Sequence, residues 1–187
     1  MKRYIIFVLF AASLHLALAQ AGSDRGKTDA GVEIDILPYL TGGYYASAWV
    51  SRNHFRYRAV LTQVTTPEFM LEDGFTNNEI QVYALIVDYF FEQEVSKFWI
   101  GAGFEYWDAG IQTDLKLEEA SYENTMFTLG GGYVWNVGRH LYLNPWAALH
   151  FRIAGDSEVP VDGLAFSPSA VTPEASLKLG WKLRSSR

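Results

Sequence analysis

The chain has 187 residues, a length that fits one domain, and 49% of its residues are hydrophobic while 16% are aromatic. Its 15 basic and 21 acidic residues give a formal charge of −6, which argues against a nucleic-acid partner because phosphate contacts need clustered Lys and Arg. It contains no Cys, so disulfides do not stabilise it. A closed sheet of hydrogen-bonded strands is another way to gain stability.

The N-terminus has the pattern of a secretory signal peptide. Lys2 and Arg3 precede an apolar run and an Ala-Leu-Ala cleavage site, so we expect residues 1–19 to be removed. Their removal would leave 13 basic and 21 acidic residues, a charge of −8. Retention as an uncleaved anchor is the alternative. Residues 20–31 are polar and Gly-rich and predict a flexible lead, and residues 32–187 form the folded domain.

Alternation of apolar and polar residues begins at Val32. Because side chains two apart share one face of a strand, residues 32–41 predict a strand with one apolar side. Gly42-Gly43 then predicts a two-residue hairpin turn, with a short returning strand at residues 44–50. A single long strand from Val32 to Val50 is the competing interpretation.

Six more segments with alternating apolar and polar residues follow. The connections between them are alternately tight turns and long loops. The expected strands are residues 54–64, 79–91, 98–107, 121–135, 140–154 and 173–183. The long loops are Thr65–Asn78, Asp108–Ala120 and Gly155–Val171, and the tight turns lie near Ser51, Glu92 and Asn136. Eight strands with short turns at one rim and long loops at the other are typical of an antiparallel, up-and-down transmembrane β-barrel with both ends in the periplasm.

The last of these strands shows the pattern most simply. Apolar Ala175, Leu177, Leu179, Trp181 and Leu183 alternate with Glu174, Ser176, Lys178, Gly180 and Lys182. About ten residues suit a tilted strand that crosses a bilayer. Trp181 stands near the end of the apolar row, where aromatic rings meet the membrane interface.

Ionisable residues lie on the strand faces opposite the apolar rows. We expect them to form a structural polar network inside the barrel: Arg56, Arg58, Asp88, Glu105, His150, Arg152, Glu174 and Lys178. Buried charges need partners, and a lumen of eight strands is just filled by side chains, so we expect pairing across it and no open pore. A soluble lipocalin-like barrel would have the opposite polarity, with an apolar interior.

Proline and glycine occur inside these strands. Pro145 lacks an N–H, so a closed barrel must give it a bulge or leave an amide unpaired. Gly101, Gly103 and Gly130–Gly132 weaken pairing as a rule. We expect them to make room for bulky tryptophans in the lumen.

Some outer-membrane barrels modify lipid, and their catalytic groups can be compared with this chain. In the His150-Phe151-Arg152 segment, Arg152 stands where a lipid deacylase has its Ser, so the base lacks a nucleophile. His54 and Asp88 could pair if their strands are neighbours, and a structural pair is the simpler interpretation. Motifs for phosphate, metal or cofactor binding are absent from the sequence. We expect no catalytic residue, cofactor or metal.

Several short segments carry a family resemblance: Gly42-Gly43-Tyr44, Arg56 to Val60, Asp88 to Phe91, Tyr106-Trp107, Asn144 to Ala147 and Pro173 to Trp181. They resemble small bacterial outer-membrane β-barrel proteins of the OmpA/OmpX-type shape, in an uncharacterised barrel family. The resemblance implies a location in the outer membrane and assembly by the barrel-insertion machinery. In such proteins the last strand ends on an aromatic residue, whereas this chain ends with Leu183 and a tail, Arg184 to Arg187.

The sequence as a whole predicts an integral outer-membrane barrel without enzymatic activity. Its role would be structural or would lie in surface contact through the three long loops, with outer-membrane lipid around it and an extracellular ligand of unknown kind. A lipid-modifying barrel enzyme and a secreted lipocalin-like barrel are the alternatives.

Overall fold

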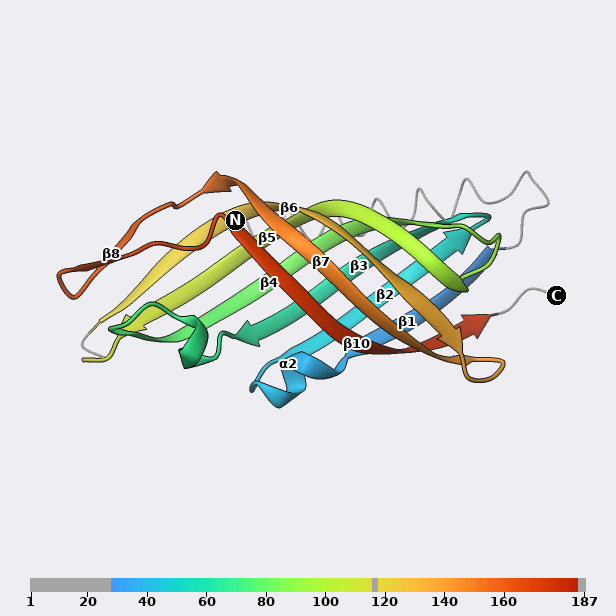
Figure 1. Cartoon of the computed structure of the whole chain (residues 1–187), viewed down its shortest axis with the longest axis horizontal. Helices are drawn as coiled ribbons and strands as arrows, with labels where there is room; N and C mark the ends of the chain where they lie inside the picture. Colours follow the sequence, from blue (N-terminus) through green and yellow to red (C-terminus); the bar gives the residue numbers. More distant parts are fainter. Residues whose placement is uncertain (1–27, 116–117, 185–187) are drawn as a thin grey trace, which may run out of the picture.

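A closed ring of eight antiparallel strands forms the molecule, in the order β1-β10-β7-β6-β5-β4-β3-β2 (Figure 1). The computed structural model describes residues 28–115 and 118–184, so the signal peptide, most of the lead and the tail after Arg184 lie outside the described residues. The barrel strands are β1 (Thr28–Asp35), β2 (Tyr44–Arg52), β3 (Phe55–Thr65), β4 (Phe75–Phe90), β5 (Lys97–Thr113), β6 (Glu119–Asn136), β7 (Leu141–Gly155) and β10 (Val171–Arg184). The predicted all-β class and eight-stranded antiparallel barrel are confirmed. None of the described helices has the length and hydropathy needed to span a bilayer.

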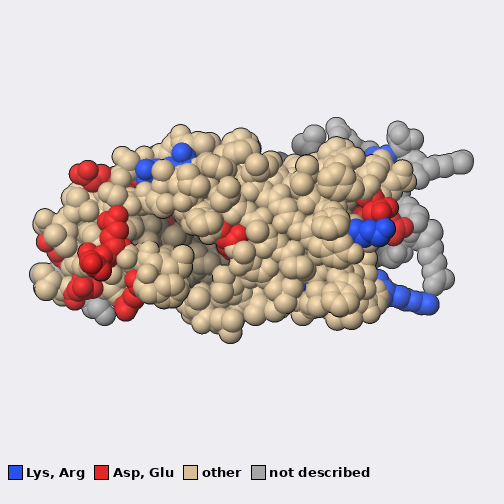
Figure 2. All heavy atoms as spheres, in the orientation of Figure 1, with Lys and Arg blue, Asp and Glu red and all other residues tan. Residues whose placement is uncertain are grey.

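The sidedness predicted for the strands outside residues 44–50 and 79–91 is also confirmed, and the structure decides it for those two segments, whose alternation left it open. Leu85 of β4 points outward and is 51% exposed, whereas Asp88, three residues further along the same strand, is fully buried inside the ring. The same alternation places Tyr57 of β3 outside and Arg56 inside. Figure 2 shows the result on one face, where the middle of the wall carries few charged residues and Asp and Glu gather at one end.

The first connection differs from the prediction. The chain forms two strands here, as expected, but a short helix, α2 (Ile36–Leu40), replaces the end of the first strand and the two-residue turn. The Asp35 side chain accepts a hydrogen bond from the Leu37 N–H at 3.1 Å and so caps the helix. Pro38 favours this outcome, because its missing N–H costs nothing in a first helical turn but would interrupt a strand ladder.

The barrel wall is unequal in height. β1 and β2 have 8 and 9 residues, whereas β4, β5 and β6 have 16, 17 and 18. Because about 9 to 11 residues span a bilayer, the three long strands have about 6 residues in excess, or about 20 Å of extended chain. Figure 1 shows them projecting past the other strands at the end that carries the long connections, called here the loop end.

Two predicted loops are therefore shorter than expected. β4 begins at Phe75, within the predicted loop Thr65–Asn78, and a 3-10 helix, η2 (Glu68–Met70), occupies its middle. β5 and β6 also continue into the predicted loop Asp108–Ala120. The predicted strand ends were wrong because they rested on an outward row of apolar side chains. In these extensions the apolar side chains point inward and the outward side chains are polar.

The third long loop, Gly155–Val171, contains a small hairpin. β8 (Val159–Val161) and β9 (Leu164–Phe166) pair with each other in a sheet separate from the barrel. Asp162 and Gly163 at its tip have positive φ angles of 49° and 76°, which is the conformation of a tight hairpin turn. Each of these strands has only three residues, which is too short for alternation of apolar and polar residues to indicate a strand.

Pro145 lies at an interruption of the β6–β7 ladder. Pairing passes from Gly132↔Trp146 to Trp135↔Leu143, with Pro145 between them. On its other side Pro145 is paired with Leu177 of β10. The closed barrel thus accepts the proline by giving up pairing on one side, as expected for a residue without an N–H.

Gly101→Ala should destabilise the barrel. A methyl group at Gly101 would collide with the carboxylate of Asp88, which has no free space to move into inside the ring. We expect a loss of about 1–3 kcal/mol in the free energy of unfolding, measured by urea titration of the detergent-folded protein. Gly138→Ala is the matched control, because nothing lies within 4 Å of the added methyl group there. Equal stability of the two variants would contradict the packing described.

Candidate functional site

Four charged side chains that are almost fully buried meet inside the lumen, in a group called here the central charge cluster. It consists of Glu33 from β1, Arg56 and Arg58 from β3, and Asp88 from β4. All four point inward because they stand on the rows opposite the apolar ones. β2 separates β1 from β3 in the ring, so Glu33 reaches its partners over the inner face of β2.

The ion pairs in this cluster are short. Asp88 Oδ2 accepts hydrogen bonds from the Nε atoms of both Arg56 and Arg58 at 2.7 Å, and its Oδ1 accepts a second bond from Arg58 at 2.9 Å. Arg56 Nη1 donates to Glu33 Oε1 at 2.8 Å. Two cations and two anions balance, which is the condition under which buried charges are tolerated.

Aromatic and polar neighbours complete the cluster. The Arg56 guanidinium lies 5.0 Å from the centre of the Phe90 ring and 5.4 Å from that of Trp99, within cation–π range. Tyr142 donates its hydroxyl to Glu33 at 2.9 Å. Arg56 is fully buried, so side chains fill the lumen at this level.

A second group, the histidine cluster, consists of Glu105, Thr128, His150 and Glu174. His150 Nδ1 lies 3.2 Å from Glu105 Oε2, and Nε2 lies 3.1 Å from Glu174 Oε2. The Thr128 hydroxyl also contacts His150 Nδ1. Glu174 keeps about a third of its side chain exposed, whereas the other three members are buried.

The histidine cluster has the parts of a nucleophile relay but not its arrangement. Thr128, His150 and Glu174 form a hydroxyl–imidazole–carboxylate chain, which the sequence prediction did not foresee because it found no nucleophile near His150. Glu105, however, faces the same ring nitrogen as Thr128. An imidazole that donates to both carboxylates would keep no lone pair to take a proton from a hydroxyl. The geometry is that of an ion-pair network.

Lys178 belongs to a third group. Its ammonium lies 3.4 Å from the centre of the Trp146 ring, a close cation–π contact. The Trp146 indole N–H donates to Asp35 at 2.7 Å, and the Ser176 hydroxyl contacts the same carboxylate. Asp35 thus caps α2 and also fixes two lumen side chains.

Arg152 stands apart from all three groups. Its Nη1 donates to the backbone carbonyls of Asp156 and Pro168, both at 2.8 Å. It therefore closes the base of the third long loop and is not brought together with the other predicted network residues.

His54 does not pair with Asp88. Its Nδ1 lies 2.9 Å from the carbonyl oxygen of Phe90, and its ring stacks on Tyr89. Asp88 is occupied by the two arginines. Across residues 28–115 and 118–184, no three His, Asp or Glu side chains are grouped as metal ligands.

Glu33, Asp35 and Thr128 were not among the predicted network residues. All three stand on inward rows that the alternation had identified, so the signal for their direction was present. What the sequence lacked was the strand tilt and register that bring Glu33 to Arg56 and Thr128 to His150.

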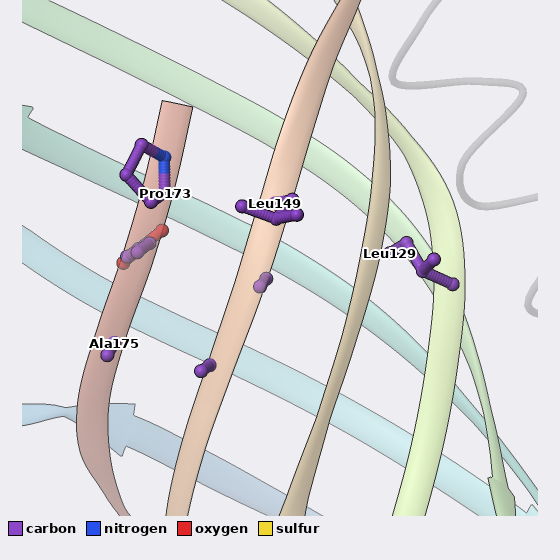
Figure 3. Close-up of a pocket in the computed structure, with 7 residues that line it drawn as sticks. Leu129, Leu149, Pro173 and Ala175 are labelled. Atoms are coloured by element: carbon purple, nitrogen blue, oxygen red, sulfur yellow. The ribbon is translucent and has the colours of Figure 1, made fainter. Parts of the chain in front are cut away.

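The outward wall has a shallow hollow over β6, β7 and β10. Leu129, Leu149, Pro173 and Ala175 line it, and its volume is about 540 Å³ (Figure 3). It is open and mainly apolar, and small alanine side chains leave the space. Glu174 of the histidine cluster also lines it, so the hollow lies in the apolar wall beside the partly exposed member of that cluster.

Asp88→Asn should destabilise the barrel strongly. The amide would leave two buried guanidinium groups with one carboxylate between them, and breaking a buried pair in this way costs about 3–5 kcal/mol. Urea unfolding of the reconstituted protein measures the loss. Glu92→Gln is the matched control, because it removes the same charge from the exposed Glu92–Lys97 pair and should leave stability unchanged. Similar midpoints for both variants would rule out an energetic role for the central charge cluster.

The comparisons with known proteins concern the fold. No protein-family model matches the chain, and no curated protein matches it. Among solved structures, Neisserial surface protein A (NspA) is similar, with a TM-score of 0.48, 12% identity, and 84% of this chain and 94% of that chain covered.

A second solved structure is more similar in shape. A major outer membrane protein from Thermus thermophilus aligns with a TM-score of 0.54 and 12% identity, covering 86% of this chain and all of that chain (100%). At this identity the match concerns the fold alone. The predicted resemblance to small outer-membrane barrels is thereby confirmed: the chain has the fold of this outer membrane protein, built from eight antiparallel strands in a closed ring.

Proposed function

We propose that the chain is an integral protein of the bacterial outer membrane, without enzymatic chemistry of its own, which acts through the surface at its loop end. Outer-membrane lipid would surround the apolar wall, and the barrel-insertion machinery would assemble it. The structural likeness to an outer membrane protein supports this proposal at the level of fold.

The observation that carries the proposal is the polarity of the wall. Ile100 and Leu129 are more than half exposed on the outside of the ring, while Arg56 and Asp88 are fully buried within it. In a water-soluble barrel this apolar surface would be exposed to water, which is unfavourable, and charged side chains would normally lie outside. Lipid around the wall would remove the exposure to water, and ion pairing within the lumen offsets the cost of burying the charges.

The loop end is suited to contact with the surroundings. Two of the connections at this end lead into or between β4, β5 and β6, which project beyond the span of a bilayer, and Figure 2 shows Asp and Glu concentrated at this end. The connections at the opposite end are short, with β2 and β3 joined at Asn53, which takes a positive φ of 55°. If the loop end faces the outside of the cell, this asymmetry places the long connections where they can contact molecules outside the cell.

Cell fractionation tests the membrane location. The full chain should sediment with the outer membrane, resist extraction by salt and dissolve in detergent. Unboiled samples should migrate differently from boiled ones, because a closed hydrogen-bonded ring survives the detergent of the gel until it is heated. Recovery in the soluble fraction, with no effect of boiling, would favour the secreted lipocalin-like alternative.

Cysteine labelling of intact cells tests the orientation. The chain has no Cys, so Leu115→Cys at the loop end and Val137→Cys in a short turn each introduce a single thiol. Both positions are well exposed, at 69% and 57%, which makes them a matched pair. A membrane-impermeant maleimide should label the first variant in intact cells and the second only after lysis. The reverse pattern would place the loop end in the periplasm.

A further inference from the structure

The β8–β9 hairpin covers the mouth of the barrel at the loop end. Val159, Val161 and Phe166 of the hairpin are each at most 5% exposed. They pack onto the inner side of the projecting strands, where the Phe166 ring lies 5.2 Å from Phe75 and 5.8 Å from Tyr122. The hairpin pairs with itself and not with the barrel strands, so side chains hold it in place.

Beneath the hairpin the lumen is lined mainly by apolar side chains, and Thr62, Asn78 and Asn124 are buried on the same inward rows. The residues that form this apolar recess with the hairpin are Tyr45, Val60, Phe75, Ile80, Val82, Ala84, Ile86, Ala109, Ile111 and Tyr122. Outer-membrane barrels have polar interiors as a rule, so an apolar half-lumen at the loop end needs its own explanation. A mouth lined in this way would be unfavourable in water if nothing covered it.

The recess has a floor. On β3, Val60 of the recess is followed on the same face by Arg58, and on β4 Ile86 is followed by Asp88. The recess therefore ends at the central charge cluster, where Arg56 and Asp88 are fully buried. A molecule that enters from the loop end would stop there and would not pass through the barrel.

Two sets of hydrogen bonds hold the hairpin, one at its tip, called here the latch, and one at its base, called here the clamp. Thr113 at the end of β5 donates its hydroxyl to Asp162 in the hairpin turn, at 2.5 Å. Arg152 holds the two limbs of the loop together through the carbonyls of Asp156 and Pro168. The clamp would keep the limbs together while the tip moves, because it joins the limbs to each other and to β7, away from the recess.

We propose that the hairpin is a displaceable plug, and that the recess beneath it is a binding site for an apolar small molecule carrying no negative charge. Phe166 between Phe75 and Tyr122 occupies the position that an aromatic or aliphatic group of the ligand would take. Entry from outside the cell rests on the orientation proposed above, whereas the chemistry of the recess does not depend on it.

Charge around the mouth excludes anions. The described residues of the loop end, 66–79, 108–115, 118–123 and 152–170, contain 12 acidic residues and one basic residue, Arg152. Figure 2 shows Asp and Glu side chains spread over that end of the molecule on the face in view. A negative field of this kind repels anions and attracts cations, so the expected ligand is neutral or cationic.

A reversible disulfide tests the plug. The side chains of Thr113 and Asp162 meet, so cysteines at both positions should form a bridge, and no other Cys interferes. The double variant Thr113→Cys/Asp162→Cys is studied as the full mature chain in lipid nanodiscs. The oxidised and reduced forms have the same sequence and fold, so a difference in dye binding between them measures the effect of locking the hairpin.

The probes are two dyes that differ by a sulfonate group. N-phenyl-1-naphthylamine is neutral, and 8-anilino-1-naphthalenesulfonate is its anionic counterpart. The neutral dye should bind saturably to the reduced form and at least about fivefold more weakly to the oxidised form, because locking lowers the population of the open state. The anionic dye should bind about tenfold more weakly than the neutral one to the reduced form.

Phe166→Ala provides a second measurement. Without its ring the plug vacates part of the recess, and the neutral dye should bind about fivefold more tightly than to the unmodified chain. Phe69→Ala is the matched control, because Phe69 on η2 is 87% exposed and lies outside the recess. Its dye affinity should not change.

Equal dye binding to the oxidised and reduced forms overturns the proposal, and so does an absence of saturable binding to Phe166→Ala. Preference for the anionic dye overturns the assigned ligand chemistry. These outcomes are distinct from failure of the proposed function, which the fractionation and labelling experiments detect in the unmodified chain and in single-cysteine variants with no change in the hairpin.

Discussion

Buried charge is the constraint on which the arrangement of this barrel depends. Arg56 and Arg58 cannot remain inside the ring unless carboxylates meet them there, because an unpaired buried ion costs several kcal/mol. Asp88 comes from the neighbouring strand β4, but Glu33 comes from β1 on the other side of β2. The ion pairs of Glu33 therefore tie together two strands that share no ladder, β1 and β3.

The lumen is layered as a consequence. Towards the short turns, Lys182 donates to the carbonyl of Val95 at 2.9 Å, and Val95 packs with Trp49 and Trp99. Above this aromatic layer lie the charge clusters, and above them the apolar recess under the β8–β9 hairpin. The buried polar groups are thus flanked by aromatic rings at one end and by a mixture of aromatic and aliphatic side chains at the other.

Strand number, strand direction and sidedness could be predicted from the sequence because alternation in a strand has a period of two and repeats in every segment. The exceptions have local physical causes. Asp35 and Pro38 convert the end of the first strand into α2, and the extensions of β4–β6 have polar outward faces that a search for lipid-facing rows discards. The hairpin at residues 159–166 depends on tertiary packing against Phe75 and Tyr122, which no local pattern encodes.

Of the candidate site, Arg56, Arg58 and Asp88 could be assigned to one lumen network, but their carboxylate partner Glu33 could not, since its place depends on tilt and shear. The same dependence makes the cluster a determinant of register. A slip of β3 by one residue would turn Arg56 and Arg58 outward and Tyr57 inward. In a membrane that slip would turn two guanidinium groups towards lipid, at a cost that depends on their depth, and would leave Glu33 and Asp88 unpaired. The ion pairs thus oppose misalignment of β3.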